Sequence, residues 1–159
     1  MINVIDKELF SGYIVKETKI LAYSLGYDQE SLIKHIEKIA KFHNLDGDLV
    51  FDENMDKFFQ EAIYRALRGE KYKFELNMYK YNKVYEELLK VERGKTITYK
   101  ELKDRTGLNY REIILALKYN PFIILIPCHR VIKSNGDLGN YTPLGREFKE
   151  KLLKFEGAI

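Results

Sequence analysis

The sequence has little cysteine, proline or tryptophan: its 159 residues include one Cys, three Pro and no Trp. One cysteine cannot form an intramolecular disulfide, and it cannot supply the several thiolates of a cysteine-rich zinc site. Long apolar runs are also missing, because the longest, residues 122–127, is much shorter than the roughly 18 residues that span a membrane. The first residues lack the basic-then-apolar pattern of a secretion signal. We therefore expect a cytoplasmic protein, in a reducing compartment, that does not enter membranes.

The charged residues are distributed unevenly along the chain. Residues 1–78 carry 11 basic and 14 acidic side chains, whereas residues 79–159 carry 16 basic and 10 acidic ones. A basic half beside a mildly acidic one favours a working surface for an anion, of which nucleic acid is the commonest. Charge alone leaves chance composition as an equal alternative.

The first half of the chain changes its hydrophobic period. Residues 2–25 alternate like short strands, and residues 28–42 have apolar side chains at helical spacing, with Asp28 or Ser31 as the N-cap. Residues 52–69 form the clearest predicted helix. Its expected buried stripe consists of Met55, Phe58, Phe59, Ala62, Ile63, Ala66 and Leu67.

Two capping patterns mark the second half, after a linker or strand at residues 71–76 and a helix at residues 77–91. Thr98 and Asn109 are each followed three residues later by Glu, and this spacing fits a capping box at the start of a helix. Two short capped helices around Gly107 indicate a helix-turn-helix, although an ordinary helical hairpin in the core has the same pattern.

The C-terminal segments surround the one cysteine. Residues 122–126 are entirely apolar and are predicted to form a short buried strand. Residues 134–137 indicate a turn and residues 138–143 an irregular loop. Residues 146–155 are predicted to form a closing helix, with one apolar face made of Phe148, Leu152 and Phe155.

Cys128 lies between Pro127 and His129-Arg130. A cysteine acts as a nucleophile only as the thiolate, and its free pKa is about 8.5, so it needs a base or a positive field nearby. Neighbours in a regular strand point to opposite faces, which disfavours direct Cys–His pairing. A bend at Pro127, or a water molecule between the two groups, would allow proton transfer. A buried, inert cysteine is the equal alternative.

The run Ile-Pro-Cys-His-Arg-Val at residues 126–131 is similar to the active-site motif of the alkylguanine-DNA alkyltransferases. The resemblance extends from about residue 84 to residue 156, with further family landmarks in order. These landmarks are Thr98-Tyr99, Arg111, Asn120-Pro121, Gly139-Asn140-Tyr141-Thr142 and Phe155-Glu156-Gly157. Residues 1–78 match only in their general layout.

The resemblance implies roles for four residues in the chemistry. Cys128 would attack the alkyl carbon on guanine O6, and His129 would take the thiol proton through water. Glu156 would orient His129. Tyr99 would help to extrude the base and donate a hydrogen bond to its ring nitrogen. Arg130 is expected to form a structural ion pair.

The resemblance also implies how DNA is bound. The second helix of the helix-turn-helix would enter the minor groove, and Arg111 would fill the gap left by the flipped nucleotide. Asn120 would brace this helix against the active-site loop. Tyr110 and Lys118 are expected to contact DNA phosphates or solvent. Binding should be largely independent of sequence and sensitive to salt.

The substrate pocket is implied in the same way. The Val131 carbonyl and the Thr142 amide would read the base edges, Tyr141 would pack on the alkyl group, and Pro127 belongs to the same pocket. The family's occasional N-terminal zinc site lacks its cysteines here, so we expect no metal. No cofactor is expected either, because the thiolate itself accepts the alkyl group.

The implied fold is α+β with two domains. Residues 1–76 would form a structural, ribonuclease-H-like domain with a small antiparallel sheet and helices. Residues 77–159 would form a mostly helical, winged-helix-like alkyltransferase domain. The implied function is DNA repair by direct, irreversible alkyl transfer to Cys128 from O6-alkylguanine in duplex DNA after base flipping, with O4-alkylthymine left open and a monomer expected.

The sequence departs from the family pattern around the DNA and the pocket. Ile114-Leu115 replaces two glycines that many members have, and the segment between Tyr99 and Arg111 is about two residues short. Pro143-Leu144 replaces two glycines at the pocket rim. Because proline stiffens the rim, we expect an altered tolerance for bulky benzyl-type adducts.

Two other functions remain open from the sequence. A non-reactive damage-binding relative would have the same shape, but Cys128 would then have no purpose. A thiol hydrolase would use Cys128 and His129, but it would have no purpose for Tyr99, Arg111 and the capped helix pair.

Overall fold

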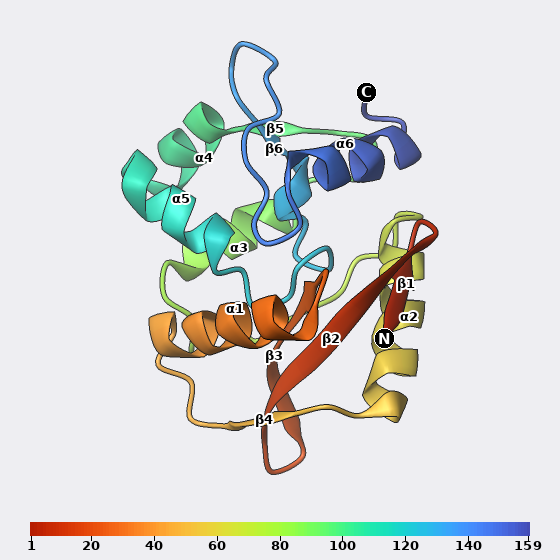
Figure 1. Cartoon of the computed structure of the whole chain (residues 1–159). Helices are drawn as coiled ribbons and strands as arrows, with labels where there is room; N and C mark the ends of the chain where they lie inside the picture. Colours follow the sequence, from red (N-terminus) through yellow and green to blue (C-terminus); the bar gives the residue numbers. More distant parts are fainter.

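The computed structural model describes all of residues 1–159, and its N-terminal half is built on a small antiparallel sheet (Figure 1). The central strand is β2 (Lys7–Lys16), which pairs with each of the other three. These partners are β1 (Ile2–Val4), β3 (Lys19–Gly26) and β4 (Asp48–Val50). The predicted combination of a small antiparallel sheet with helices is confirmed.

Two helices cover this sheet. α1 (Gln29–Phe42) packs against β2 and β3, and Asp28 caps it by accepting the backbone N–H of Ser31. α2 (Glu53–Ala66) packs against β1. The predicted stripe of α2 is wrong at one position, because Phe58 is 63% exposed whereas Phe59 is 3% exposed. The buried face is narrower than the run of apolar residues.

The connection between the halves contains no strand at residues 71–76, so it is a linker. The helix predicted for residues 77–91 is shorter: α3 runs over Asn82–Leu88. It begins late because Tyr81 adopts a left-handed backbone conformation with φ 55°, which a continuing helix does not allow.

The two predicted capping boxes are confirmed. Thr98 begins α4 (Tyr99–Thr106) and Asn109 begins α5 (Tyr110–Lys118), and each cap exchanges hydrogen bonds with the Glu three residues later. Gly107 ends α4 in a left-handed conformation with φ 74°, which glycine adopts without strain. The two helices pack against each other as a helix-turn-helix pair.

The strand predicted for residues 122–126 is wrong. Ile124 has φ 72°, the chain turns there, and the N–H of Ile126 donates to the carbonyl of Phe122 at 2.8 Å. All five side chains are buried, as expected. A short apolar run indicates that its side chains are buried, but it does not specify the backbone conformation. Here a turn, and not a strand, buries the same side chains.

The chain then forms a short 3₁₀ turn, Cys128–Arg130, and enters β6 (Val131–Ile132), which pairs in parallel with β5 (Ile97–Thr98). α6 (Arg146–Phe155) closes the fold and packs on the 3₁₀ turn. Its predicted face is wrong at Phe155, which is 37% exposed.

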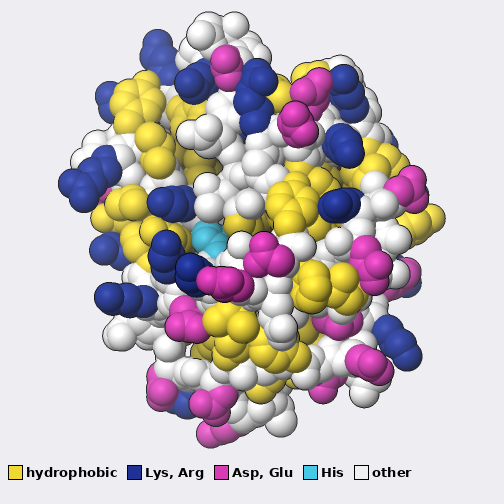
Figure 2. Space-filling view, in the orientation of Figure 1, with side chains coloured by type: hydrophobic (Ala, Val, Ile, Leu, Met, Phe, Trp, Pro, Cys, Tyr) yellow, Lys and Arg dark blue, Asp and Glu magenta, His cyan; other side chains and the backbone are white.

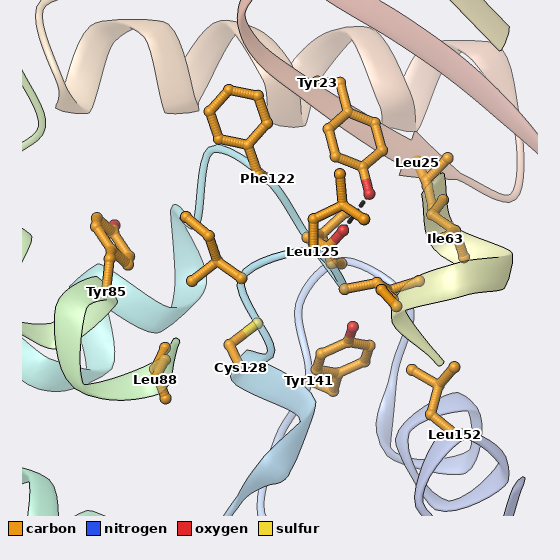
Figure 3. Close-up of a cluster of buried hydrophobic side chains, with 14 of the residues drawn as sticks. Tyr23, Leu25, Ile63, Tyr85, Leu88, Phe122, Leu125, Cys128, Tyr141 and Leu152 are labelled. Atoms are coloured by element: carbon orange, nitrogen blue, oxygen red, sulfur yellow. Dashed lines mark hydrogen bonds between the residues drawn. The ribbon is translucent and has the colours of Figure 1, made fainter. Parts of the chain in front are cut away.

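One hydrophobic core joins the two halves. It contains residues from the sheet, α2, the helix-turn-helix and α6, and Cys128 belongs to it. Figure 3 shows Tyr23 from β3 beside Phe122 and Leu125, with the Tyr23 hydroxyl donating to the Ile123 carbonyl. The N-terminal sheet therefore supports the segment that leads to Cys128. None of the helices is long and apolar enough to cross a bilayer.

Candidate active site

Asn120 joins the end of α5 to the segment before Cys128. Its side chain is buried, its Nδ2 donates to the carbonyl of Ile126 at 2.7 Å, and its Oδ1 accepts the N–H of Phe122 at 2.9 Å. An amide side chain with both ends bonded in a buried place holds one conformation. The position of Cys128 is thereby tied to the helix-turn-helix.

Cys128 lines a cavity of about 210 Å³ between α5 and the loop before α6. The other residues that line it are Tyr99, Ile114, Leu117, Lys118, Asn140, Tyr141 and Thr142. In Figure 3 the Tyr141 ring lies beside the Cys128 sulfur. The sequence predicted four of these residues as site residues, namely Cys128, Tyr99, Tyr141 and Thr142, and placed Lys118 at the DNA.

The Cys128 thiol is buried, and burial raises its pKa to about 11. A hydrogen bond from Asn120 and the positive charge of Lys149 act in the opposite direction without outweighing burial. The group is therefore a thiol at neutral pH. Reaction as a nucleophile requires that a base take its proton.

His129 has the features that such a base requires. Its ring is fully buried, and Nε2 lies 2.9 Å from Oε1 of Glu156. A carboxylate can only accept, so Nε2 carries the hydrogen and Nδ1 is left unprotonated. Nδ1 has no hydrogen-bond partner in the protein. Burial lowers the pKa of His129, against the opposing effect of Glu156, so the neutral ring is favoured.

Glu156 binds two side chains at once. Besides His129, it accepts Nε of Arg130 at 3.1 Å on Oε1 and Nη2 of Arg130 on Oε2. Burial raises the pKa of Glu156, but the hydrogen bonds from His129 and Arg130 outweigh it and bring the pKa down to about 2. Nη1 of Arg130 also donates to the carbonyl of Val91 at 2.7 Å. Arg130 thus has the structural ion pair that we expected.

Tyr99 forms a wall of the cavity at the first residue of α4. Gly139, with φ 74°, packs against its hydroxyl: a Cβ at residue 139 would lie 3.0 Å from that oxygen. Only glycine adopts this conformation without strain and leaves this space. The pairing of Tyr99 with Gly139 brings the loop of residues 138–142 over the cavity.

The predicted DNA-binding residues Tyr110, Arg111 and Lys118 lie on one helix, α5, and are exposed. A second cavity, of about 420 Å³, adjoins the first along Tyr99, Ile114 and Asn140, and Lys100 and Lys133 line it. In Figure 2, Lys and Arg side chains gather along the side that carries α4 and α5, whereas Asp and Glu side chains prevail over the lower part.

Two predicted pocket residues lie behind the cavity. Pro127 and Val131 are buried and do not line it. No hydrogen bond joins Cys128 to His129 directly, and the predicted site residues Asn120, His129 and Glu156 are also behind the cavity wall. No three His, Cys, Asp or Glu side chains come together in a group that could hold a metal ion.

Lys149 is a site residue that sequence reasoning missed. It lies on α6, is fully buried, and its Nζ donates to the carbonyls of Leu138 and Asn140 in the loop over the cavity. Burial lowers its pKa to about 8. A lysine in a helix normally indicates a solvated face, but residue 149 shares a helical face with Leu152, Leu153 and Glu156, and this spacing could have identified it.

Comparisons with known proteins agree on one family. Residues 80–158 match the family model described as 6-O-methylguanine DNA methyltransferase, DNA binding domain. A methylated-DNA–protein-cysteine methyltransferase of Thermococcus sibiricus is 37% identical over 96% of this chain and 91% of its own length. Its counterpart in Metallosphaera sedula is 46% identical over 48% of each protein, so this second alignment spans about half of that relative.

Solved structures agree with this result. The O6-methylguanine-DNA methyltransferase of Pyrococcus kodakaraensis superposes with a TM-score of 0.70 at 26% identity, over 94% of this chain and 92% of that one. The Mycobacterium tuberculosis protein OGT, solved in complex with DNA, superposes with a TM-score of 0.54 at 31% identity, over 64% of this chain and 65% of that one.

Proposed function

Since this chain belongs to the family of methylated-DNA–protein-cysteine methyltransferases, we propose that Cys128 is the residue that accepts the alkyl group. Methyl transfer from DNA to a protein cysteine is the activity that the relatives' names state, and this protein shares it as a DNA-repair methyltransferase. The assignment of Cys128 rests on one observation. The chain has one cysteine, and it lines a cavity beside a buried histidine with a free Nδ1.

The proposed reaction is one displacement. His129, oriented by Glu156, takes the Cys128 proton at Nδ1 through a water molecule. The sulfur attacks the alkyl carbon, the S–C bond forms, and the bond between that carbon and guanine O6 breaks. Tyr99 donates a hydrogen bond to the base, and the guanine anion released from the alkyl group takes up one proton from solvent, so that the repaired base remains in the DNA. The product is a thioether, and because it has no ionisable hydrogen the protein acts once.

The proposed substrate is O6-alkylguanine in duplex DNA, with O4-alkylthymine as a second candidate. α5 would enter the minor groove, and Arg111 would take the place of the flipped nucleotide. Tyr110 and Lys118 would contact the backbone. The exposure of all three on one helix supports this placement. The protein would bind as a monomer in the cytoplasm.

Within the cavity, Tyr141 would pack on the alkyl group and the Thr142 amide would bind the base edge. The Val131 carbonyl, which belongs to a residue behind the cavity wall, is the proposed second contact to the base. Pro127 would shape the wall behind Cys128. We further propose that residues 1–76 form a structural domain of ribonuclease-H-like type and residues 77–159 a winged-helix-like domain that carries the chemistry. The match of the family model to residues 80–158 supports that division.

The test is a measurement of protein mass after incubation with a duplex that contains O6-methylguanine. We expect a single mass increase of one CH₂ unit, located on Cys128 by peptide mapping and absent from Cys128→Ser. Binding of the duplex without an adduct would instead indicate a damage-binding protein. Repeated turnover of a thioester would indicate a thiol hydrolase.

A further inference from the structure

Tyr27 lies at a junction of the N-terminal half that cannot easily move. It follows β3 directly and precedes Asp28, the N-cap of α1. Gly26, the last residue of β3, is packed so closely against α1 that a Cβ there would lie 3.0 Å from the backbone nitrogen of Leu32. The chain at Tyr27 is therefore held by both the sheet and the helix.

The side chain of Tyr27 reaches the other half of the molecule. Its hydroxyl donates to the carbonyl of Leu144 at 2.5 Å, across 117 residues of sequence. The ring is 46% exposed, and Nζ of Lys7 lies 5.6 Å from its centroid. The hydroxyl thus makes one specific contact with the other half.

Leu144 belongs to the turn that carries two lining residues of the Cys128 cavity. The turn of residues 141–145 is closed by the N–H of Gly145, which donates to the carbonyl of Tyr141 at 2.5 Å. Tyr141 and Thr142 of this turn line the cavity, and the Leu144 side chain is buried in the common core. Outward movement of this wall therefore requires that the Leu144 carbonyl leave Tyr27.

The rim is tied at two points. Lys149 holds the carbonyls of Leu138 and Asn140 from α6, and Tyr27 holds the carbonyl of Leu144 from the sheet. The cavity that Cys128 lines, at about 210 Å³, is below the roughly 300 Å³ at which pockets for small molecules usually begin. A bulky alkyl group should therefore gain more than a methyl group from outward movement of the rim.

We propose that Tyr27 is a specificity-determining residue: its hydrogen bond to Leu144 holds the cavity rim in place and selects small adducts over bulky ones. This inference rests on the proposed function, and it gives the N-terminal half a part in substrate choice. Tyr27 does not touch the reacting atoms. It acts through the position of the turn of residues 141–145.

The experiment compares Tyr27→Phe with wild type on two duplexes, one with O6-methylguanine and one with O6-benzylguanine, by single-turnover rates of adduct formation. Tyr27→Phe removes only the hydroxyl. We expect the ratio of the benzyl rate to the methyl rate to rise about three- to tenfold, the range that one hydrogen bond provides. Amide hydrogen exchange at Gly145, whose N–H closes the turn, should become faster.

Tyr64→Phe is the matched control. Tyr64 is also in the N-terminal half, is 52% exposed, and its hydroxyl makes no hydrogen bond in the protein, so its ratio should equal that of wild type. An unchanged ratio in Tyr27→Phe, or an equal fall in both rates, overturns the inference even if methyl adducts form normally. If wild type forms no methyl adduct on Cys128, the proposed function itself fails.

Discussion

All three histidines are buried, and His43 in the N-terminal half and His129 in the C-terminal half are held differently. His43, at the end of α1, uses both nitrogens: Nε2 donates to the carbonyl of Tyr119 at 2.8 Å, and Nδ1 accepts the backbone N–H of Lys80 at 3.0 Å. The hydroxyl of Tyr85 lies 3.2 Å from Nε2. His43 therefore joins α1 to the end of α5 and has no free nitrogen.

His129 uses one nitrogen only, since Nε2 donates to Glu156 and Nδ1 has no partner. Burial lowers the pKa of both rings, that of His43 to about 4. A lowered pKa therefore does not distinguish a base from a structural histidine. The free nitrogen and the carboxylate that fixes the tautomer make the difference.

The largest expected effect is a difference in the rate of alkyl transfer between variants of His129 and of His43. His129→Gln should slow adduct formation about 10²- to 10⁴-fold, the usual contribution of a general base. His43→Gln should leave the rate at saturating DNA near that of wild type, because His43 does not face the cavity. The measurement is single-turnover transfer at neutral pH. Equal losses in the two variants would contradict the distinction.

Removal of the carboxylate should mainly reduce stability. Glu156→Gln leaves the Arg130 guanidinium buried without its counter-charge, and such a loss destabilises a protein by about 3 to 5 kcal/mol. Urea denaturation measures it. Glu150→Gln on the same helix is the control and should change stability little, because the Glu150 side chain is 40% exposed and its ion pair with Lys154 is solvated. Similar midpoints for both variants would show that the buried pair contributes nothing particular.

The acid dependence of stability should include a contribution from His43, beside that of His35, whose pKa burial also lowers to about 4. The pKa of His43 is about 4 in the folded protein against an ordinary 6.5, so the unfolded chain binds the proton first as pH falls. The stabilisation is complete above pH 6.5 and is lost between pH 6.5 and about 4, by about 3 kcal/mol. The free energy of unfolding, measured by denaturation at several pH values across this range, should decrease less with falling pH in His43→Gln than in wild type. A parallel decline in both proteins would contradict the assignment.

The smallest expected effect is at the N-terminal end of α5, which Asn109 caps. Asn109→Ala removes the side chain that accepts the N–H of Glu112 at 2.9 Å, and loss of such a cap reduces stability by about 1 kcal/mol. Thermal unfolding measures it. The transfer rate at saturating DNA should be unchanged, since the cap lies at the opposite end of α5 from Asn120. A large loss of rate would show that the cap positions the site.

Sequence patterns predicted the local structure correctly where only residues close together in the sequence form the interaction. The capping boxes at Thr98 and Asn109 formed as predicted, because each involves residues three apart. The turn at Ile124 and the exposure of Phe58 were not predictable in this way. Both depend on what packs against the segment, and an apolar residue by itself does not specify its neighbour.

The sequence by itself determined the family and indicated the residue that we propose as reactive, since one cysteine in a distinctive motif needs no folding to be recognised. Only the tertiary structure decided which nitrogen of His129 is free, because Glu156 reaches it from 27 residues away. The same holds for Lys149, which is buried and binds the loop over the cavity, and for Tyr27, whose hydroxyl donates to the Leu144 carbonyl. Proton positions and pocket rims depend on contacts between distant residues, and these exist only in the folded chain.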